Sequence, residues 1–185
     1  MKKLILASAS PRRKQLLSEF GFEFEIIYSD KEGEYDGSAP DKFAVRCAIN
    51  KAEDVFLKCG EDTVVLGADT VVCLDGKIFE KPKDEADAKR MLLSLSGKTH
   101  EVITGYAILS KGMRETGKVV TNVTFNNLDN QLIGEYLKSG LWQGKAGAYG
   151  IQDGFNLVEK CDGYYDNVVG LPIEYLNDTL KEFLK

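Results

Sequence analysis

Near its beginning the chain passes directly from a strand pattern into a helix whose first turn is cationic. Residues 4–7 form an apolar run typical of a buried strand, and Ser10 and Pro11 suit a helix N-cap and first helical position. The helix then opens with three cations, Arg12, Arg13 and Lys14. Because the positive end of a helix dipole favours acids, this placement costs free energy unless an anion lies against it. The segment therefore favours a phosphate site over the alternative, a solvated basic turn.

The overall composition requires any such phosphate site to be a local feature. The chain has 185 residues, 43% of them hydrophobic, and a net charge of -5. These values fit one domain or two small lobes and argue against nucleic acid as a partner. A polyanionic ligand would need a positive pocket within an acidic protein. The groups available for it at the helix start are backbone N–H groups and the side chains of Ser8, Ser10, Arg12 and Arg13.

The chain carries no pattern for a membrane or for secretion. No apolar run is long enough to span a bilayer, and the first residues enter a strand without a signal-peptide pattern. Apolar surroundings predict reduced core thiols for the four scattered cysteines, Cys47, Cys59, Cys73 and Cys161. We therefore expect a cytoplasmic protein with no membrane contact.

Alternating strand and helix patterns predict an α/β fold over a single unit, residues 1–185. We expect strands at 4–7, 22–28, 63–74, 77–80, 102–109, 118–125 and 157–161. We expect helices at 11–20, 41–59, 84–95, 129–137 and 172–183, with loops at 29–40 and 140–154. Asp75 and Gly76 are typical of a hairpin turn, and such hairpins favour a mixed sheet over an all-parallel one.

Asp69 is a carboxylate within the apolar run 64–72. Burying an unpaired carboxylate is expensive, so Asp69 must meet a cation, a metal or several donors. A structural ion pair is one interpretation, and small neighbours that leave room for a ligand favour a functional one. Counting back from the hairpin puts Thr70 opposite Lys81, and strict alternation sends Asp69 to the other face. A bulge or twist would be needed to join Asp69 and Lys81.

Other candidate groups are less specific. Lys51 flanks an apolar helical stripe, where a lysine usually reaches to water. Glu32 and Glu34 lie in an acidic loop that could bind a divalent cation or remain solvated. The glycine-rich loop 145–152 allows close approach to a ligand, and the donor and acceptor of Gln152 suit the edge of a nucleobase. The single histidine, His100, has no ligand cluster around it in the sequence and is expected to be structural.

Taken together, seven segments resemble the Maf family of nucleoside triphosphate pyrophosphatases. They are LASASPRR (6–13), GADTVV (67–72), EKP (80–82), LSG (95–97), TG (104–105), KAGAYGIQ (145–152) and VGLP (169–172). Each segment alone is weak, but the ordered set is specific and covers nearly the whole chain. The resemblance implies a mixed twisted sheet flanked by helices, in two lobes around a cleft. This fold is similar to that of the inosine triphosphate pyrophosphatases (Ham1).

The resemblance also implies an activity and its residues. The family hydrolyses nucleoside triphosphates between the α- and β-phosphates, with Mg²⁺ or Mn²⁺, and it is often dimeric, which allows a homodimer here. Its catalytic acid falls on Asp69 and its lysines on Lys51 and Lys81. Its phosphate-binding residues fall on Ser8, Ser10, Arg12 and Arg13. Its metal site would use Asp69 and Glu32. Where the family has two adjacent acids this chain has Glu32 and Gly33, so Glu34 remains an alternative ligand.

Three positions separate substrate classes in the family, and here they are Arg12, Thr70 and Gln152. This set resembles the branch acting on dTTP and UTP, together with modified pyrimidine nucleotides. One alternative is the branch acting on 7-methyl-GTP. Another is a nucleotide-binding regulator of septum formation with little catalysis.

Overall fold

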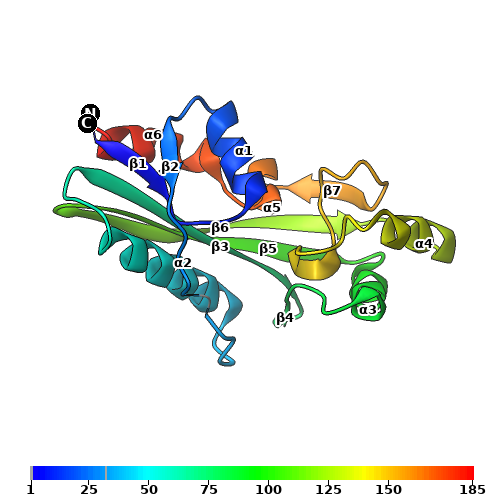
Figure 1. The fold of residues 1–185 in the computed structure, drawn as a ribbon. Coiled ribbons are helices and arrows are strands. Elements are labelled where there is room, and N and C mark those ends of the chain that lie inside the picture. Colours follow the sequence, from blue (N-terminus) through cyan, green and yellow to red (C-terminus); the bar gives the residue numbers. More distant parts are fainter. Residues whose placement is uncertain (1, 32) are drawn as a thin grey trace.

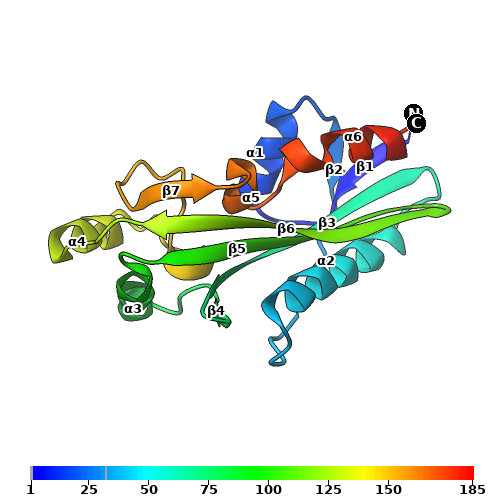
Figure 2. The same ribbon diagram turned by 180° about the vertical axis from the view of Figure 1, so that it is seen from behind.

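The protein is described by a computed structural model that covers residues 2–31 and 33–185. Its centre is a seven-stranded mixed sheet with helices on both faces (Figures 1 and 2). The strands are β1 (Lys3–Leu6), β2 (Phe24–Ile26), β3 (Thr63–Leu74), β4 (Lys77–Phe79), β5 (Thr99–Ser110), β6 (Met113–Phe125) and β7 (Val158–Asp162). The helices are α1 (Pro11–Glu19), α2 (Pro40–Phe56), α3 (Glu85–Leu95), α4 (Asn130–Ser139), α5 (Tyr165–Val169) and α6 (Ile173–Phe183), with a 3-10 turn, η1 (Ala146–Ala148).

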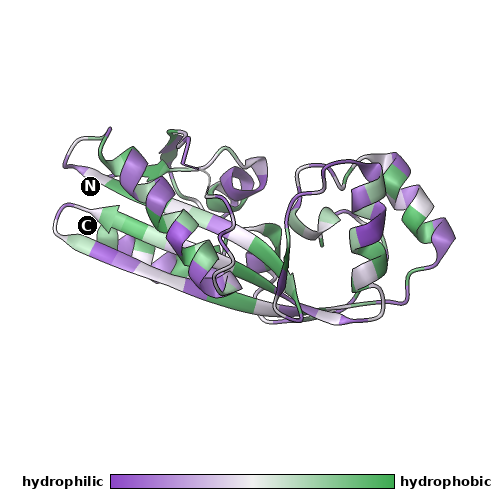
Figure 3. Ribbon diagram, turned by 90° about the horizontal axis from the view of Figure 1, so that it is seen from below, coloured by the Kyte–Doolittle hydropathy of each residue, from purple (hydrophilic) through white to green (hydrophobic). Residues whose placement is uncertain are grey.

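Three long strands, β3, β5 and β6, run through both halves of the molecule. The sheet order is β2-β1-β3-β5-β6-β7, and β4 pairs with β3. β1 is parallel to β2 and β3, whereas all other pairs are antiparallel. A mixed sheet is therefore confirmed, and two lobes are joined by the long strands (Figure 3).

Each lobe has its own apolar core. In one lobe, α1 and α6 cover one face of the sheet around Leu17 and Leu180, and α2 covers the other face around Ala52. In the second lobe, α3 and α4 pack with β7 and η1 around Leu92 and Tyr136. Backbone N–H of Lys2 donates to the carbonyl of Leu184 at 3.1 Å, which joins the two ends of the chain.

Helix α2 lies against β3 and β5 at glycine positions. A Cβ on Gly105 would lie 2.3–2.4 Å from backbone atoms of Ala44 and Val45, and a Cβ on Gly67 would lie 2.4 Å from the carbonyl of Ala48. Only glycine permits so close an approach of helix backbone to strand backbone. The two glycines therefore fix the height of α2, and of its Lys51, above the sheet.

Most predicted elements are confirmed, with differences at their ends. The N-cap at Ser10 is confirmed, since its side chain accepts from the N–H of Arg13 at 3.5 Å. β5 and β6 are longer than predicted because their hairpin continues to the pair Ser110–Met113. α5 was not predicted, and part of the predicted loop 140–154 is the turn η1. Among the described residues no helix is long and apolar enough to cross a bilayer.

We predict that Gly105→Ala destabilises the protein by about 1–3 kcal/mol, because the added methyl group meets rigid backbone of α2. The measurement is the free energy of unfolding in urea. Gly134→Ala in α4 is the matched control: nothing lies within 4 Å of its added Cβ, and alanine suits a helix better than glycine. Equal stability of Gly105→Ala and Gly134→Ala would show that α2 is not held by this approach.

Candidate active site

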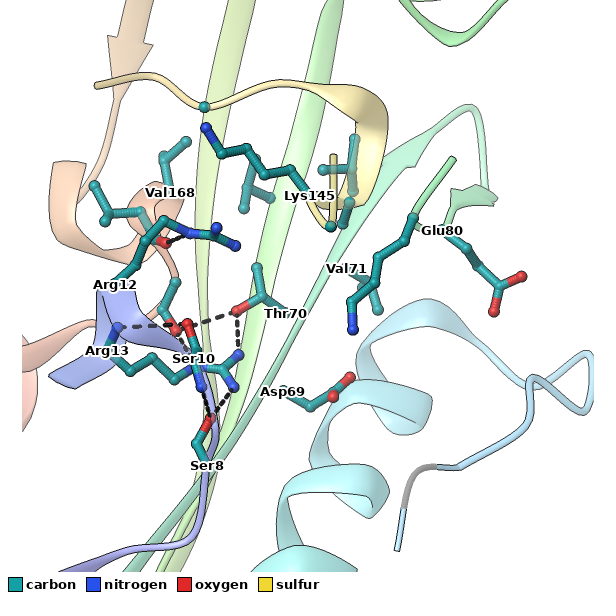
Figure 4. Close-up of a pocket in the computed structure, with 18 of the residues that line it drawn as sticks. Ser8, Ser10, Arg12, Arg13, Asp69, Thr70, Val71, Glu80, Lys145 and Val168 are labelled. Carbon is teal, nitrogen blue, oxygen red and sulfur yellow. Dashed lines mark hydrogen bonds between the residues drawn. The ribbon is translucent and has the colours of Figure 1, made fainter. Parts of the chain in front are cut away.

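The candidate site lies where one edge of β3 is without a partner strand among the described residues. On this edge β1 pairs with β3 as far as Leu66, and β4 pairs with it only from Val72 onwards. A cavity of about 570 Å³ opens beside residues 69–72, between the two lobes (Figure 4). The gap between β1 and β4 therefore gives a ligand access to the middle of the sheet.

The cavity unites almost all site residues predicted from the sequence. Those that line it are Ser8, Ser10, Arg12, Arg13, Lys51, Asp69, Thr70, Lys81 and Gln152. They come from the β1–α1 segment, α2, β3, the residues after β4 and the loop after η1. The fold thus brings together residues that are up to 144 positions apart in the sequence. The cleft predicted from the family resemblance is present.

Alternation along β3 sends Asp69 and Thr70 to opposite faces of the sheet. Asp69 shares the α2 face with Gly67, and Lys51 of α2 donates to Asp69 Oδ1 at 2.6 Å. The two side chains are 12% and 20% exposed. The sequence left a structural ion pair open for Asp69 and favoured a solvated Lys51. The structure instead pairs these two groups at the cavity.

Thr70, on the other face, belongs to a network with Arg13. Arg13 is buried and donates to Gly170 O at 2.7 Å, Ser8 Oγ at 3.0 Å and Thr70 Oγ1 at 3.1 Å. Thr70 Oγ1 also bonds Thr104 Oγ1 at 2.9 Å. Burial lowers the pKa of the Arg13 guanidinium, and the charge of Asp69 opposes that shift. Arg13 therefore ties the start of α1 to β3 and keeps two further N–H groups for a ligand.

Arg12 points into the cavity with fewer protein contacts (Figure 4). Its Nε donates to Val169 O at 3.3 Å, and its terminal nitrogens bond no other described residue. Ser10 N donates to Ser8 Oγ at 3.3 Å, which shapes the turn before the helix. Two adjacent arginines thus differ: Arg13 is fixed by protein partners, whereas the fork of Arg12 is available to an anion.

The end of α5 and the following Gly170 supply the carbonyls that hold both arginines. Asn167 Nδ2 donates to Val102 O and Val119 O at 3.1 and 3.2 Å, across two strands. The Asp166 carboxylate accepts N–H of Glu174 at 2.7 Å, and burial raises the pKa of Asp166. Sequence reasoning missed these residues, since a five-residue helix gives little periodic signal.

The predicted hairpin register is confirmed, but it does not place Lys81. Leu74 pairs with Lys77 as expected, and the ladder ends at the pair Val72–Phe79. Lys81 lies beyond the ladder and reaches the same cavity as Asp69, so alternation within the strand no longer separates them. Glu80, which the sequence analysis did not assign to the site, also lines the cavity.

The predicted metal ligands are only partly described. Glu32 lies outside the described residues, and Glu34 is exposed and absent from the cavity lining, although Gly33 belongs to it. A Cβ on Gly33 would lie 2.5 Å from Cys47 Sγ, so glycine fits here where the family has an acid. Among the described residues no group of three His, Cys, Asp or Glu side chains forms a metal cage.

A second charged cluster, missed from the sequence, lies beside the cavity, and its Lys145 belongs to the cavity lining. Lys145 Nζ donates to both carboxylate oxygens of Asp153 at 2.6 Å, and Tyr136 donates to the same carboxylate at 2.6 Å. The eight-residue separation of the ion pair follows neither a helix nor a strand period. The only local signal was the glycine content of the loop, which indicated an unusual backbone but not this pair.

His100 is buried and contacts a residue that lines the cavity. Its Nε2 bonds Tyr149 Oη at 2.7 Å, and its Nδ1 has no partner among the described residues. Tyr149 in turn lines the cavity. Burial lowers the pKa of His100 to about 4. The ring is therefore neutral near pH 7, in agreement with the structural role expected from the sequence.

The fold and the cavity define an α/β protein with a cleft between two lobes, in which Asp69 lies among several cations. Residues 3–183 match the family model described as Maf-like protein. The chain belongs to this family, as the sequence segments predicted.

Relatives across nearly the full length carry the same name. The chain is 48% identical over 174 residues to a dTTP/UTP pyrophosphatase of Thermococcus kodakarensis, covering 94% of this chain and 93% of the relative. It is 46% identical over 184 residues to a dTTP/UTP pyrophosphatase of Clostridioides difficile, covering 97% and 94%. A HAM1 protein from Coxiella burnetii has a similar fold, with a TM-score of 0.58, 16% identity and coverage of 98% and 100%. The fold predicted from the family resemblance is confirmed.

We predict that Arg13→Lys and Arg12→Lys have different effects on stability. Arg13→Lys should lower the free energy of unfolding by about 2–4 kcal/mol, because one ammonium cannot replace three directed bonds in a buried site. Arg12→Lys should change it by less than about 1 kcal/mol. Urea unfolding of both variants measures this. Equal losses would mean that the two arginines are not divided between structure and ligand.

We also predict that stability falls between about pH 6.5 and pH 4 because of His100. In this range His100 binds a proton in the unfolded chain but not in the folded state, so acidification favours unfolding. The stability contributed by neutral His100 is complete above the unfolded pKa and is lost as the pH falls toward about 4. The loss is on the order of 3 kcal/mol.

The measurement is the free energy of unfolding at several pH values for the wild type and for His100→Gln. The chain has a single histidine, so the difference between the two pH profiles isolates this group from the carboxylates. Parallel profiles would contradict the burial argument.

Proposed function

We propose that this protein hydrolyses dTTP and UTP to the nucleoside monophosphate and pyrophosphate. The observation that carries the proposal is the position of Asp69 in one cavity with Arg12, Lys51 and Lys81. A cleft of about 570 Å³ has the size of a small-molecule site. The substrate class is supported by the names of relatives that are 46–48% identical over nearly the whole chain.

In this mechanism the cations hold the phosphates and the carboxylate acts on water. A triphosphate carries about four negative charges, and Arg12, Arg13, Lys51 and Lys81 offset most of them without a basic protein overall, since Lys51 is also paired with Asp69. Lys51 bonds Oδ1 of Asp69 and so fixes the carboxylate. The second oxygen of Asp69 would accept a proton from the water that attacks the α-phosphorus, and pyrophosphate leaves.

A divalent cation, Mg²⁺ or Mn²⁺, would be bound together with the substrate. Mg²⁺ in such sites is typically held by one or two carboxylates plus phosphate oxygens. The cavity fits this arrangement, because the Asp69 carboxylate lines it while the described residues form no closed cage. Glu32 remains a proposed ligand. When bound, the cation would neutralise charge on the phosphates and the leaving group.

Base selection is assigned to Arg12, Thr70 and Gln152. Gln152 is exposed in the cavity, so its amide is available to the edge of a base. The Thr70 hydroxyl already bonds Arg13 and Thr104, so its role would be to shape the pocket.

We further propose that the enzyme acts in the cytoplasm, with a homodimer as an allowed assembly.

We predict that Asp69→Asn folds like the wild type but loses activity about 10²–10⁴-fold in kcat, because the amide cannot accept the proton from water. The measurement is product analysis with dTTP, UTP, CTP and 7-methyl-GTP in Mg²⁺ or Mn²⁺, separating pyrophosphate from stepwise phosphate release. Asp75→Asn is the matched control, since it removes a carboxylate at the exposed hairpin tip of the same strand.

Three results would contradict the proposal. Wild-type rates in Asp69→Asn would remove the carboxylate from the mechanism. Faster turnover of 7-methyl-GTP than of dTTP and UTP would change the substrate class. Binding of nucleotides without any pyrophosphate release would favour the regulator of septum formation.

A further inference from the structure

A buried ion pair that the proposed mechanism does not use lies beside the cavity, which Lys145 lines. The side chains of Lys145 and Asp153 are only 11% and 5% exposed. Taking two charges out of water costs free energy that a pair regains only with good geometry and additional hydrogen bonds. A hydrophobic pair would often be as stable, so stability alone does not explain these charges. Their position beside Gln152 and Arg12 points to a role in the site.

The pair fastens the turn that presents Gln152. N–H of Asp153 donates to Gly150 O at 3.1 Å, which closes a turn with Gln152 at its third position. N–H of Gly150 donates to Tyr136 Oη at 3.2 Å, and this hydroxyl donates to Asp153 Oδ2. The turn is therefore fixed at both ends, to α4 through Tyr136 and to the residue before η1 through Lys145.

The packing around this turn leaves it little freedom. A Cβ on Gly150 would lie 2.7 Å from both carboxylate oxygens of Asp153 and 2.8 Å from Lys145 Nζ. The backbone of the turn is thus in direct contact with the ion pair. Any change in the pair is transmitted to Gln152, whose side chain needs a defined position to distinguish one base edge from another.

The same carboxylate also acts on Arg12. Burial lowers the pKa of the Arg12 guanidinium, and the negative charge of Asp153 is the main effect opposing this shift. Asp153 thus lies within electrostatic reach of two cations, Lys145 and Arg12. It neutralises Lys145, so that Arg12 is the cation left for phosphates on this side of the cavity.

We propose that Asp153 is a positioning residue for base selectivity, an inference that rests on the nucleotide activity proposed above. It holds Gln152 at the place where the base edge arrives. It also neutralises Lys145, which would otherwise bind the phosphates at a second position. The triphosphate is then bound in one register, with its base end at Gln152.

The test compares substrates with and without a base. In Asp153→Asn, kcat/KM for dTTP should fall at least about tenfold relative to CTP, mainly through KM, because Gln152 is no longer fixed. Hydrolysis of methyl triphosphate, which has no base or sugar, should show no such loss, because the variant keeps Arg12 and releases Lys145 toward the phosphates. Tyr136→Phe removes both the bond to Asp153 and the acceptor for N–H of Gly150, and should give a loss of the same kind.

The matched control is Asp162→Asn, the same substitution in an exposed ion pair with Lys160, in which both side chains are 69% exposed. It should leave all ratios unchanged. An equal loss for dTTP and methyl triphosphate in Asp153→Asn, or an unchanged ratio of dTTP to CTP, would overturn the proposal. If Asp153→Asn does not fold, the same substrate ratios measured for Tyr136→Phe test the proposal.

Dissociation constants separate this inference from the proposed activity. They are measured for α,β-methylene analogues of dTTP and CTP and for inorganic tripolyphosphate. A wild type that binds dTTP over CTP but releases no pyrophosphate contradicts the activity alone. If Asp153→Asn retains that binding preference, the positioning role is contradicted, whether or not the wild type is active.

Discussion

The site depends on the fact that β3 belongs to both lobes, while the middle of one of its edges has no partner strand in the part of the chain that the structure describes. β1 and β4 pair with opposite ends of this edge, and the cavity lies between them. Because side chains alternate along a strand, Asp69 meets α2 and Thr70 meets α1 and the α5 segment. One strand therefore orients groups from both faces toward a common opening, and neither lobe could form the site alone.

Electrostatics explains how an acidic chain can hold a polyanion. The net charge is -5, yet the cations Arg12, Lys51 and Lys81 gather at one cleft with low-dielectric walls, which focuses their field. Ion pairs limit the number of charges that face the ligand: Lys51 is paired with Asp69 and Lys145 with Asp153, whereas Arg13 is held by neutral oxygens and keeps its charge. The positive charge that faces the phosphates therefore depends on where these side chains lie and not on the overall composition of the chain.

Local signals in the sequence predicted most of the fold and part of the site. The hairpin after β3 and the cap at Ser10 follow from turn and capping chemistry, which act over a few residues. The Lys51–Asp69 pair could not be predicted from spacing, because it depends on how closely α2 approaches β3. The Lys145–Asp153 pair depends on the path of a glycine-rich loop, which has no period. The family resemblance brought Lys51 into the site where physical reasoning had placed it in solvent.

The choice between an enzyme and a nucleotide-binding regulator can be argued from Asp69 itself. A pocket that binds a polyanion without a metal ion gains nothing from a carboxylate among its cations, because the carboxylate repels phosphate oxygens and engages Lys51. Replacing Asp69 by a neutral residue would free that lysine for the ligand and strengthen binding. The Asp69 carboxylate is held at 2.6 Å by a lysine, is 20% exposed and lines the cavity. Such a group weakens the binding of phosphates but can activate water. The presence of Asp69 therefore favours turnover over storage or signalling.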